Sequence, residues 1–226
     1  MLRPEPRRLS IIIPTLNEAA GIAAALAALA PLRAGGHEIV VVDGGSSDET
    51  LEHARGGCDR LLPSERGRAL QMNAGARAAQ GDALVFLHAD TRLPPGAEHE
   101  VLQALRHALW GRFDVAIDSR HPLLRAVAWG MNLRSRWTGI ATGDQAIFVR
   151  RDAFAGYPPI ALMEDVAFSA RMKRQGPPAC LRSRVRTSAR RWEARGVLRT
   201  VLRMWRLRLL YFLGAHPERL ARLYDA

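Results

Sequence analysis

Residues 9–14 read LSIIIP and residues 38–42 read EIVVV, and each run leads directly into polar, turn-forming residues. A third apolar run, ALVFL, covers residues 83–87. Continuous apolar runs of this length are typical of strands that are buried on both faces of a parallel sheet. Segments rich in Ala, Leu and Glu, typical of helices, lie between or beside the runs, at 18–30, 48–55 and 68–80. This alternation predicts an α/β domain with a doubly wound sheet.

The second half of the chain is less regular. Its pattern predicts strands near residues 113–117 and 146–150 and a helix over about 164–175. A long helical tail is predicted over residues 194–213. No internal repeat and no low-complexity linker interrupts the sequence, so we expect a single domain over residues 1–226.

Composition agrees with a globular protein that has its own core. The chain has 226 residues, of which 48% are hydrophobic and 24% are charged. A chain of this length can bury roughly 70% of its unfolded surface, so it needs no disulfide or structural metal to fold. The composition excludes the disordered, collagen-like and coiled-coil classes. Its two cysteines, Cys58 and Cys180, are too few for a zinc site or a disulfide framework, and we expect buried thiols. No cleavable signal and no run of 18 uncharged apolar residues is present, so a cytoplasmic location is expected.

The charge of the chain is its most unusual property. There are 33 Lys and Arg residues against 22 Asp and Glu residues, a net charge of +11. Between Arg182 and Arg208 the sequence has ten arginines and one acid, Glu193. Such an asymmetry indicates an anionic partner, which could be a phosphate compound, a membrane surface or a nucleic acid.

Polar residues gather where the predicted strands end, at 14–18, 43–48 and 88–91. Asp, Ser and Gly are common in turns, so any one of these segments could be an ordinary loop. Because the carboxyl ends of parallel strands meet at one edge of a sheet, three such segments together predict a ligand crevice there.

The segments SIIIPTLNE at 10–18 and EIVVVDGGSSDET at 38–50 resemble the opening of family 2 glycosyltransferases. The likeness continues through GRALQMNAG at 67–75, HAD at 88–90, GDQ at 143–145 and ED at 164–165, and it spans at least residues 9–175. It is nearest to a small subgroup with His-Ala-Asp at the metal motif. The resemblance implies the GT-A fold, with a mixed, mostly parallel sheet flanked by helices, and a nucleoside-diphosphate sugar as donor. It also divides the chain into a nucleotide-sugar half at 9–110, an acceptor half at 111–190 and a basic helical tail at 191–226.

Carried onto this sequence, the resemblance implies a nucleotide-sugar site in which Asp43 accepts a hydrogen bond from the base. Its other implied members are Pro14, Thr15, Asn17, Glu18, Gly45, Ser46, Arg68, Asn73, His88, Ala89 and Asp90. Asp90 and His88 would hold a divalent cation, Mn²⁺ or Mg²⁺, that bridges the diphosphate.

Three positions depart from the family pattern. His88 stands where the first Asp of the Asp-X-Asp motif is usual, Gly44 replaces an acid, and Met72 replaces an arginine. Either Arg66 or Arg68 can supply the missing positive charge. These three departures affect the expected nucleotide and metal. They affect the expected class of reaction less.

Glu164 and Asp165 match the acidic pair on the acceptor side of the family. The resemblance implies that Asp165 is the general base of an inverting transfer and that Glu164 orients the acceptor. The alternative is an ordinary helix start, where acids stabilise the amino end. Further residues implied in acceptor or phosphate contacts are Gly143, Asp144, Gln145, Arg191 and Trp192.

The tail at 196–213 has apolar residues at helical spacing, with arginines on another face. Such a basic amphipathic helix can lie on an anionic membrane, here the inner face, or it can pack against the sheet or a second subunit of a homo-oligomer. A lipid-linked or otherwise apolar acceptor would suit the membrane interpretation. Because the tail arginines alternate with apolar residues and no nucleic-acid motif is present, we expect no nucleic acid partner.

Two other functions remain open from the sequence. A nucleotidyltransferase of similar fold would also use Asp90 and a metal, but its usual Gly-rich basic loop does not follow the first strand. A non-catalytic sugar-nucleotide-binding protein is suggested by His88 and Gly44, while the presence of both Asp90 and the 164–165 pair speaks against it.

Overall fold

The computed structural model describes residues 5–225, apart from the side chains at positions 191, 195 and 225. Its centre is one sheet in the order β3-β2-β1-β4-β7-β6-β8-β5. Strands β1 to β4 are mutually parallel, β7 is antiparallel to both its neighbours, and β6 is parallel to β8. The strand bounds are β1 Leu9–Thr15, β2 Glu38–Asp43, β3 Arg60–Pro63, β4 Ala83–Phe86, β5 Thr91–Arg92, β6 Trp110–Asp118, β7 Phe148–Arg150 and β8 Ala179–Ser188. The predicted α/β class with a mixed, mostly parallel sheet is therefore confirmed.

Helices cover both faces of this sheet. On one face, Leu9, Ile11 and Ile13 of β1 pack with residues of α1 and α4; on the other, Ile12 packs with residues of α3 and α6. Because successive side chains of a strand point to opposite faces, an uninterrupted apolar run is what a strand covered on both sides requires. These helices, with the short α2, span α1 Ala19–Ala34, α2 Thr50–Ala54, α3 Arg68–Ala78, α4 Ala97–Ala104 and α6 Glu164–Lys173.

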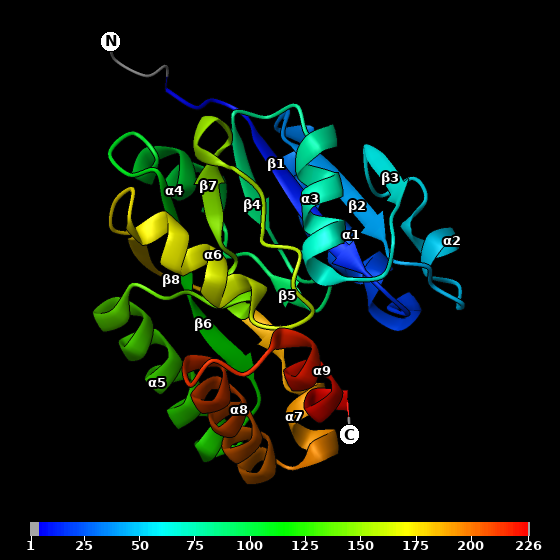
Figure 1. The fold of residues 1–226 in the computed structure, drawn as a ribbon. Coiled ribbons are helices and arrows are strands. Elements are labelled where there is room, and N and C mark those ends of the chain that lie inside the picture. Colours follow the sequence, from blue (N-terminus) through cyan, green and yellow to red (C-terminus); the bar gives the residue numbers. More distant parts are fainter. Residues whose placement is uncertain (1–4, 226) are drawn as a thin grey trace.

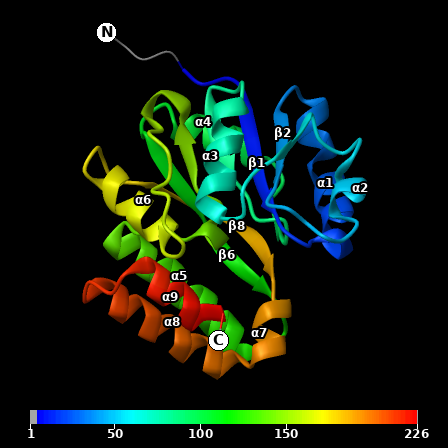
Figure 2. The same cartoon turned by 45° about the vertical axis from the view of Figure 1, so that its right-hand side comes forward.

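The remaining helices gather at one end of the molecule, alongside β6 and beyond the end of β8 (Figures 1 and 2). They are α5 Pro122–Thr138, α7 Arg190–Arg195, α8 Val197–Phe212 and α9 Pro217–Asp225; two short 3₁₀ turns, η1 Gly143–Gln145 and η2 Arg151–Ala153, flank β7. Helix α8 packs against α5, α7 and α9. Leu207 of α8 and Leu220 of α9 are buried together with Met163 and Val166.

Two expectations need correction. The tail is not one continuous helix from residue 194, because α7 ends at Arg195 and α8 begins after Gly196. Gly196 has φ 80° and ψ 128°, a conformation that interrupts an α-helix and that glycine adopts at little cost. The two cysteines are free and half-buried rather than fully buried. Within residues 5–225, no helix combines the length and the apolar character needed to cross a membrane.

Candidate active site

The loops that follow β1 and β2 are tied to each other by Asp43. Thr15 and Asp43 are register partners at the ends of these parallel strands. One carboxylate oxygen of Asp43 accepts the amides of Gly45 and Ser46 at 2.9 and 2.8 Å, and the other accepts the Ser46 hydroxyl at 2.5 Å. Ser46 Oγ in turn accepts the amide of Asn17 at 2.9 Å. Asp43 is only 3% exposed, and its carboxylate organises this loop.

A cavity of about 970 Å³ lies beside this scaffold. The predicted site residues that line it come from the ends of β1 and β4, the start of α3, the turn η1, the start of α6 and helix α7. They are Pro14, Thr15, Glu18, Arg68, His88, Asp90, Gly143, Asp144, Glu164, Asp165 and Trp192. The predicted residues outside its lining are Asn17, Asp43, Gly45, Ser46, Asn73, Ala89 and Gln145, and the side chain of Arg191 lies outside the described residues.

The residues after β4 face the turn η1. His88 Nδ1 is 3.3 Å from a carboxylate oxygen of Asp144, and a Cβ added to Gly143 would stand 2.5 Å from His88 Nε2. The imidazole is therefore packed directly on the backbone of Gly143, which explains why a glycine fits there. The carboxylate of Asp90 receives a long contact of 3.4 Å from the Thr91 hydroxyl. Its backbone carbonyl accepts the amide of Ser188, which fixes the end of β8 beside it.

The acidic pair begins helix α6. Met163 precedes it with φ 69°, a conformation that is uncommon outside glycine and that its packing against Leu207 and Leu220 holds in place. Asp165 accepts the amide of Gly143 at 2.9 Å through one oxygen and that of Val166 at 2.7 Å through the other. Glu164 is 4% exposed and lies 3.7 Å from the guanidinium of Arg68.

The charges of this pair influence each other. Burial raises the pKa of Glu164, the carboxylate of Asp165 raises it further, and the positive charge of Arg68 opposes both effects. For Arg68, burial acts against the charged form, but the carboxylates of Glu164, Asp144 and Asp165 outweigh it, so its pKa is raised. A buried carboxyl group with a raised pKa in a cavity is a common feature of acid–base sites.

Asn73 and Gln145 act as supports. Asn73 Nδ2 donates to the carbonyl of Tyr157 at 2.9 Å and its Oδ1 accepts the Tyr157 amide at 2.7 Å, which binds α3 to the segment that leads into α6. Gln145 is fully buried; its Oε1 accepts the amide of Thr142 at 3.2 Å. Both residues therefore hold site segments in position from outside the cavity.

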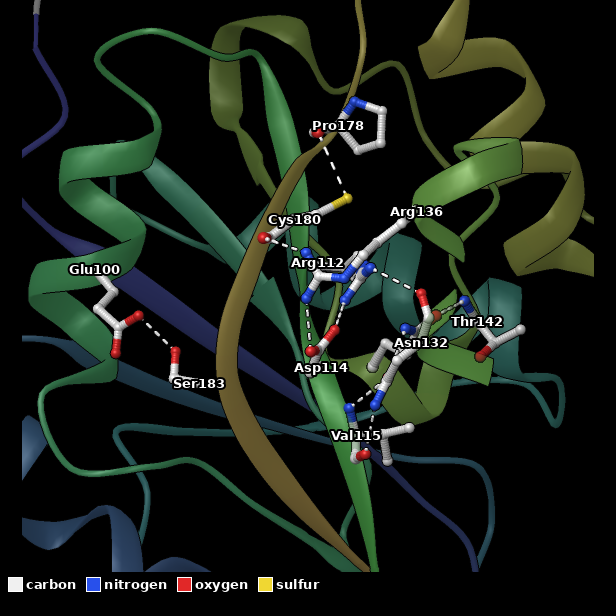
Figure 3. Close-up of polar contacts among 11 residues, drawn as sticks. Glu100, Arg112, Asp114, Val115, Asn132, Arg136, Thr142, Pro178, Cys180 and Ser183 are labelled. Atoms are coloured by element: carbon white, nitrogen blue, oxygen red, sulfur yellow. Dashed lines mark hydrogen bonds and ion pairs between the residues drawn. The ribbon is translucent and has the colours of Figure 1, made fainter. Parts of the chain in front are cut away.

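A buried polar network holds α5 against β6 (Figure 3). Asn132 donates to the carbonyl of Val115 at 2.9 Å and accepts its amide at 2.8 Å, so a side chain completes the hydrogen bonding of this strand residue. Asp114 receives ion pairs from Arg112 and from Arg136, the latter at 2.6 Å. This network fixes the helix that forms one wall of the cavity.

The sequence did not indicate how much of the cavity wall comes from α5, α8 and α9. Lining residues from these helices include Leu123, Val127, Met131, Arg134, Val201, Met204, Arg208 and Tyr224. The amphipathic pattern of the tail predicted an apolar face, and it carried no signal for what that face would cover. Glu18 also links the two halves, because its carboxylate lies 3.0 Å from the guanidinium of Arg190.

Comparison with solved structures identifies the architecture. The chain aligns with Staphylococcus aureus TarS 1–349 in complex with UDP at a TM-score of 0.65 and 18% identity, over 80% of this chain and 60% of that chain. It aligns with glucosyl-3-phosphoglycerate synthase of Mycobacterium tuberculosis, in complex with Mn²⁺, UDP and phosphoglyceric acid, at a TM-score of 0.59 and 20% identity, over 79% and 68% of the two chains. At these identities the likeness establishes the fold, which is that of GT-A glycosyltransferases.

The model of the family Glycosyl transferase family 2 matches residues 10–161. The chain therefore belongs to this family. It is 44% identical over 91 residues to a PGL/p-HBAD biosynthesis glycosyltransferase of Mycobacterium bovis, which is 37% of this chain and 36% of that protein. It is 32% identical over 121 residues to a dolichol-phosphate mannosyltransferase of Pyrococcus furiosus, or 50% and 33% of the two chains. The matched stretches thus cover about a third of the length of these curated relatives.

Proposed function

We propose that this protein transfers a sugar from a nucleoside diphosphate sugar to a hydroxyl group of an acceptor. The observation that carries the proposal is that Asp90, from the end of the β4 segment, and Asp165, from the start of α6, line one cavity. A metal-binding carboxylate and a second carboxylate for proton removal are the two groups that this reaction needs. The volume of about 970 Å³ lies at the upper end of the range for small-molecule sites.

The donor would occupy the part of the cavity next to β1 and α3. Pro14, Thr15 and Glu18 line it from the end of β1, and Arg68 lines it from the start of α3. The two proteins of similar fold named above were solved with UDP, which supports a nucleoside diphosphate here. The loop that Asp43 organises borders this region, so we assign Asn17, Gly45 and Ser46 to shaping the nucleotide site.

A divalent cation fits the carboxylate of Asp90. Mg²⁺ and Mn²⁺ are commonly held by one or two carboxylates, with substrate phosphates and water completing the shell. Asp90 lines the cavity and its carboxylate has only the long Thr91 contact among the described side chains. His88 fits less well in its present orientation, since Nε2 faces Gly143 and Nδ1 faces Asp144. A bound cation would offset the negative charge that grows on the departing diphosphate.

Asp165 is the base that we propose for the acceptor. As the acceptor oxygen attacks the anomeric carbon, its proton passes to Asp165 and the bond from that carbon to the diphosphate breaks. This single displacement inverts the anomeric configuration. The amides of Gly143 and Val166 hold the carboxylate in place. Glu164 with Arg68 forms the charged pair beside it, and Gly143, Asp144 and Trp192 border the acceptor.

The place of action that we propose is an anionic membrane surface, at its inner face. Helix α8 exposes a row of large apolar side chains: Leu198, Leu202, Trp205, Leu209 and Phe212 are 60–72% exposed. Arginines on the same helix would contact anionic headgroups. We also propose membership of the subgroup with His-Ala-Asp at positions 88–90, on the close packing of His88 and Gly143.

The experiment that tests this function measures donor hydrolysis, which needs no known acceptor. UDP- and GDP-sugars are incubated with the protein and Mn²⁺, and free sugar is followed by proton NMR. Asp165→Asn should bind the donor normally and lose 10²–10⁴-fold in turnover, the usual contribution of a positioned base. Asp118→Asn, at a side chain that is 67% exposed, is the matched control.

Three outcomes would contradict the proposal. They are near-normal turnover of Asp165→Asn, a released sugar that retains the configuration of the donor, and absence of binding to every nucleotide sugar. Consumption of a nucleoside triphosphate with release of pyrophosphate would instead support a nucleotidyltransferase.

A further inference from the structure

Two arginines in the wall of the cavity have unsatisfied donors. Arg134 lies on α5 and Arg208 on α8, and both line the cavity. Within the described part of the chain, Arg134 Nη2 and Arg208 Nε are buried without a hydrogen-bond partner. A buried N–H group without a hydrogen-bond partner destabilises the folded protein, and more so when it is charged, so native structures seldom keep one without use.

Among the described residues, Arg112 Nε and Arg171 Nε are also buried without a partner, but neither residue lines the cavity. Two other arginines, one on α5 and one on α8, have partners. Arg136 of α5 shares the carboxylate of Asp114 with Arg112. Arg203, five residues before Arg208, donates to the carbonyls of Leu223 and Tyr224 and so holds α9 against α8. The carboxylate that influences both Arg134 and Arg208 is that of Asp165, but its oxygens already accept two backbone amides.

The positive charges of Arg134 and Arg208 are thus held near each other on half-buried side chains. Burial lowers the pKa of Arg134 to about 10, and the positive charge of Arg208 contributes to that decrease. Burial also lowers the pKa of Arg208. Both groups remain cationic at neutral pH, so an anion between them would relieve their repulsion and satisfy the free N–H donors. Guanidinium groups suit phosphate oxygens especially well because their donors form a planar fork.

The surroundings of the pair are apolar. Leu123, Val127 and Met131 of α5 line the same cavity from one side, and Val197, Val201 and Met204 of α8 line it from the other. Helix α8 carries its exposed apolar row on to the surface, with Leu202 and Trp205 at 62% and 70% exposure. A ligand held by the two arginines would therefore continue into an apolar channel between α5 and α8.

We infer that Arg134 and Arg208 bind the phosphate group of an acceptor whose apolar part lies between α5 and α8. This rests on the proposed function, since it places the acceptor beside Asp165. The two positive charges favour the phosphate group of such a molecule, and the apolar lining favours its apolar part. A neutral apolar alcohol or a fully polar phosphate would satisfy only one of the two features, and a neutral sugar would satisfy neither.

The test is calorimetry with octyl phosphate, 1-octanol and inorganic phosphate, at concentrations that avoid micelles. Octyl phosphate should bind at least tenfold more tightly than either of the other two. Arg134→Gln and Arg208→Gln should each weaken it by at least tenfold, and Arg208→Lys by less. Arg206→Gln, an exposed arginine two positions away that does not line the cavity, should leave it unchanged. Circular dichroism and thermal melting confirm that each variant is folded.

Equal binding by the wild type and both glutamine variants would overturn the inference, as would absence of octyl phosphate binding to the folded wild type. Equal affinity for inorganic phosphate and octyl phosphate would contradict the claim that an apolar group binds between α5 and α8. It would indicate that the ligand is a small free phosphate compound. Binding of nucleotide sugars is measured on the same samples. If the wild type binds a donor but no octyl phosphate, this inference alone is contradicted. If no donor binds to the wild type, the proposed transferase is contradicted.

Discussion

The amide of Gly143 donates to a carboxylate oxygen of Asp165 at 2.9 Å, and the same glycine lies against the imidazole of His88. One residue therefore joins three segments that are far apart in the sequence: the end of the β4 segment, the turn η1 and the start of α6. Gly143 donates its backbone amide, and its lack of a side chain leaves room for the imidazole of His88. A glycine at this position therefore matters because it sets the geometry of the site, not because it takes part in the reaction.

Gly143→Ala should disrupt this junction. The new Cβ would stand 2.5 Å from His88 Nε2, a distance that forces the ring or the turn to move. We expect donor hydrolysis to fall by about tenfold or more, because a misplacement of about 1 Å in a site is costly. Overpacking typically costs about 1–3 kcal/mol in the free energy of unfolding, measured by urea denaturation.

Gly21→Ala is the matched control for this substitution. Gly21 lies in α1 and does not line the cavity, and a Cβ there meets nothing within 4 Å. The change should leave hydrolysis unaltered and stabilise the helix by about 0.5–1 kcal/mol. Wild-type activity in Gly143→Ala would show that the close packing of His88 has no part in the reaction.

Asp90→Asn should remove metal-dependent binding of the nucleoside diphosphate. The amide retains the size of the side chain but lacks the negative charge that a hard divalent cation prefers. Calorimetry with UDP and GDP, with and without Mn²⁺, measures the effect. The stimulation by Mn²⁺ should disappear while the weak metal-free affinity remains. An unchanged response to Mn²⁺ would remove Asp90 from the metal site.

Glu164→Gln should change how stability depends on pH. The pKa of Glu164 is raised in the folded protein by burial, then by Asp165, against the opposing charge of Arg68. In the unfolded chain it returns to about 4.3. Between these two values the folded state binds more protons, so the wild-type free energy of unfolding falls as pH rises through this window. The glutamine variant should lack this decrease.

Urea denaturation from pH 4 to 8 distinguishes the two proteins. We expect Glu164→Gln to gain stability relative to the wild type as pH rises, while donor hydrolysis decreases. Parallel stability curves for the wild type and the variant would contradict the raised pKa.

Helix α8 should give salt-sensitive binding to anionic vesicles. An arginine near such a surface contributes on the order of 1 kcal/mol, and salt screens the attraction beyond about 8 Å at physiological ionic strength. Flotation with phosphatidylglycerol vesicles should recover the wild type, and the double variant Leu202→Ser, Trp205→Ser should stay behind. Leu51→Ser, on α2, is the control for loss of an exposed leucine.

Equal recovery with neutral and anionic vesicles would contradict the membrane proposal. Absence of vesicle binding together with a dimer in sedimentation equilibrium would assign the exposed face of α8 to contact between copies of the chain.

The sequence by itself determined three strands of the first half, β1, β2 and β4, and it predicted the position of the site. The short strands β3 and β5 were not predicted. Residues 11–13, 39–42 and 83–86 are apolar at every successive position, as a strand that is covered on both faces requires. Parallel strands bring their carboxyl ends to one edge, so Thr15, His88 and Asp90 were expected near each other, and the structure lines one cavity with them. The segment carrying Glu164 and Asp165 was found by its likeness to the family, not by local pattern.

Other features depended on contacts between distant segments. Asp43 ends its strand as predicted, but its carboxylate is occupied by Gly45 and Ser46, which only the folded loop reveals. The helix predicted over 194–213 is interrupted because Gly196, between α7 and α8, has a positive φ of 80°.

Tertiary structure alone decided what α8 does for the site. Its sequence predicted one apolar face and one basic face, and both Arg206 and Arg208 belong to the same basic run. Packing against α5 leaves Arg206 exposed and encloses Arg208 beside Arg134. Whether an arginine is solvated or desolvated depends on which surface covers it, and that surface comes from a helix far away in the chain. The periodicity of the sequence predicts the apolar face of α8. The half-buried positive charges of Arg134 and Arg208 arise only because α5 and α8 pack against each other.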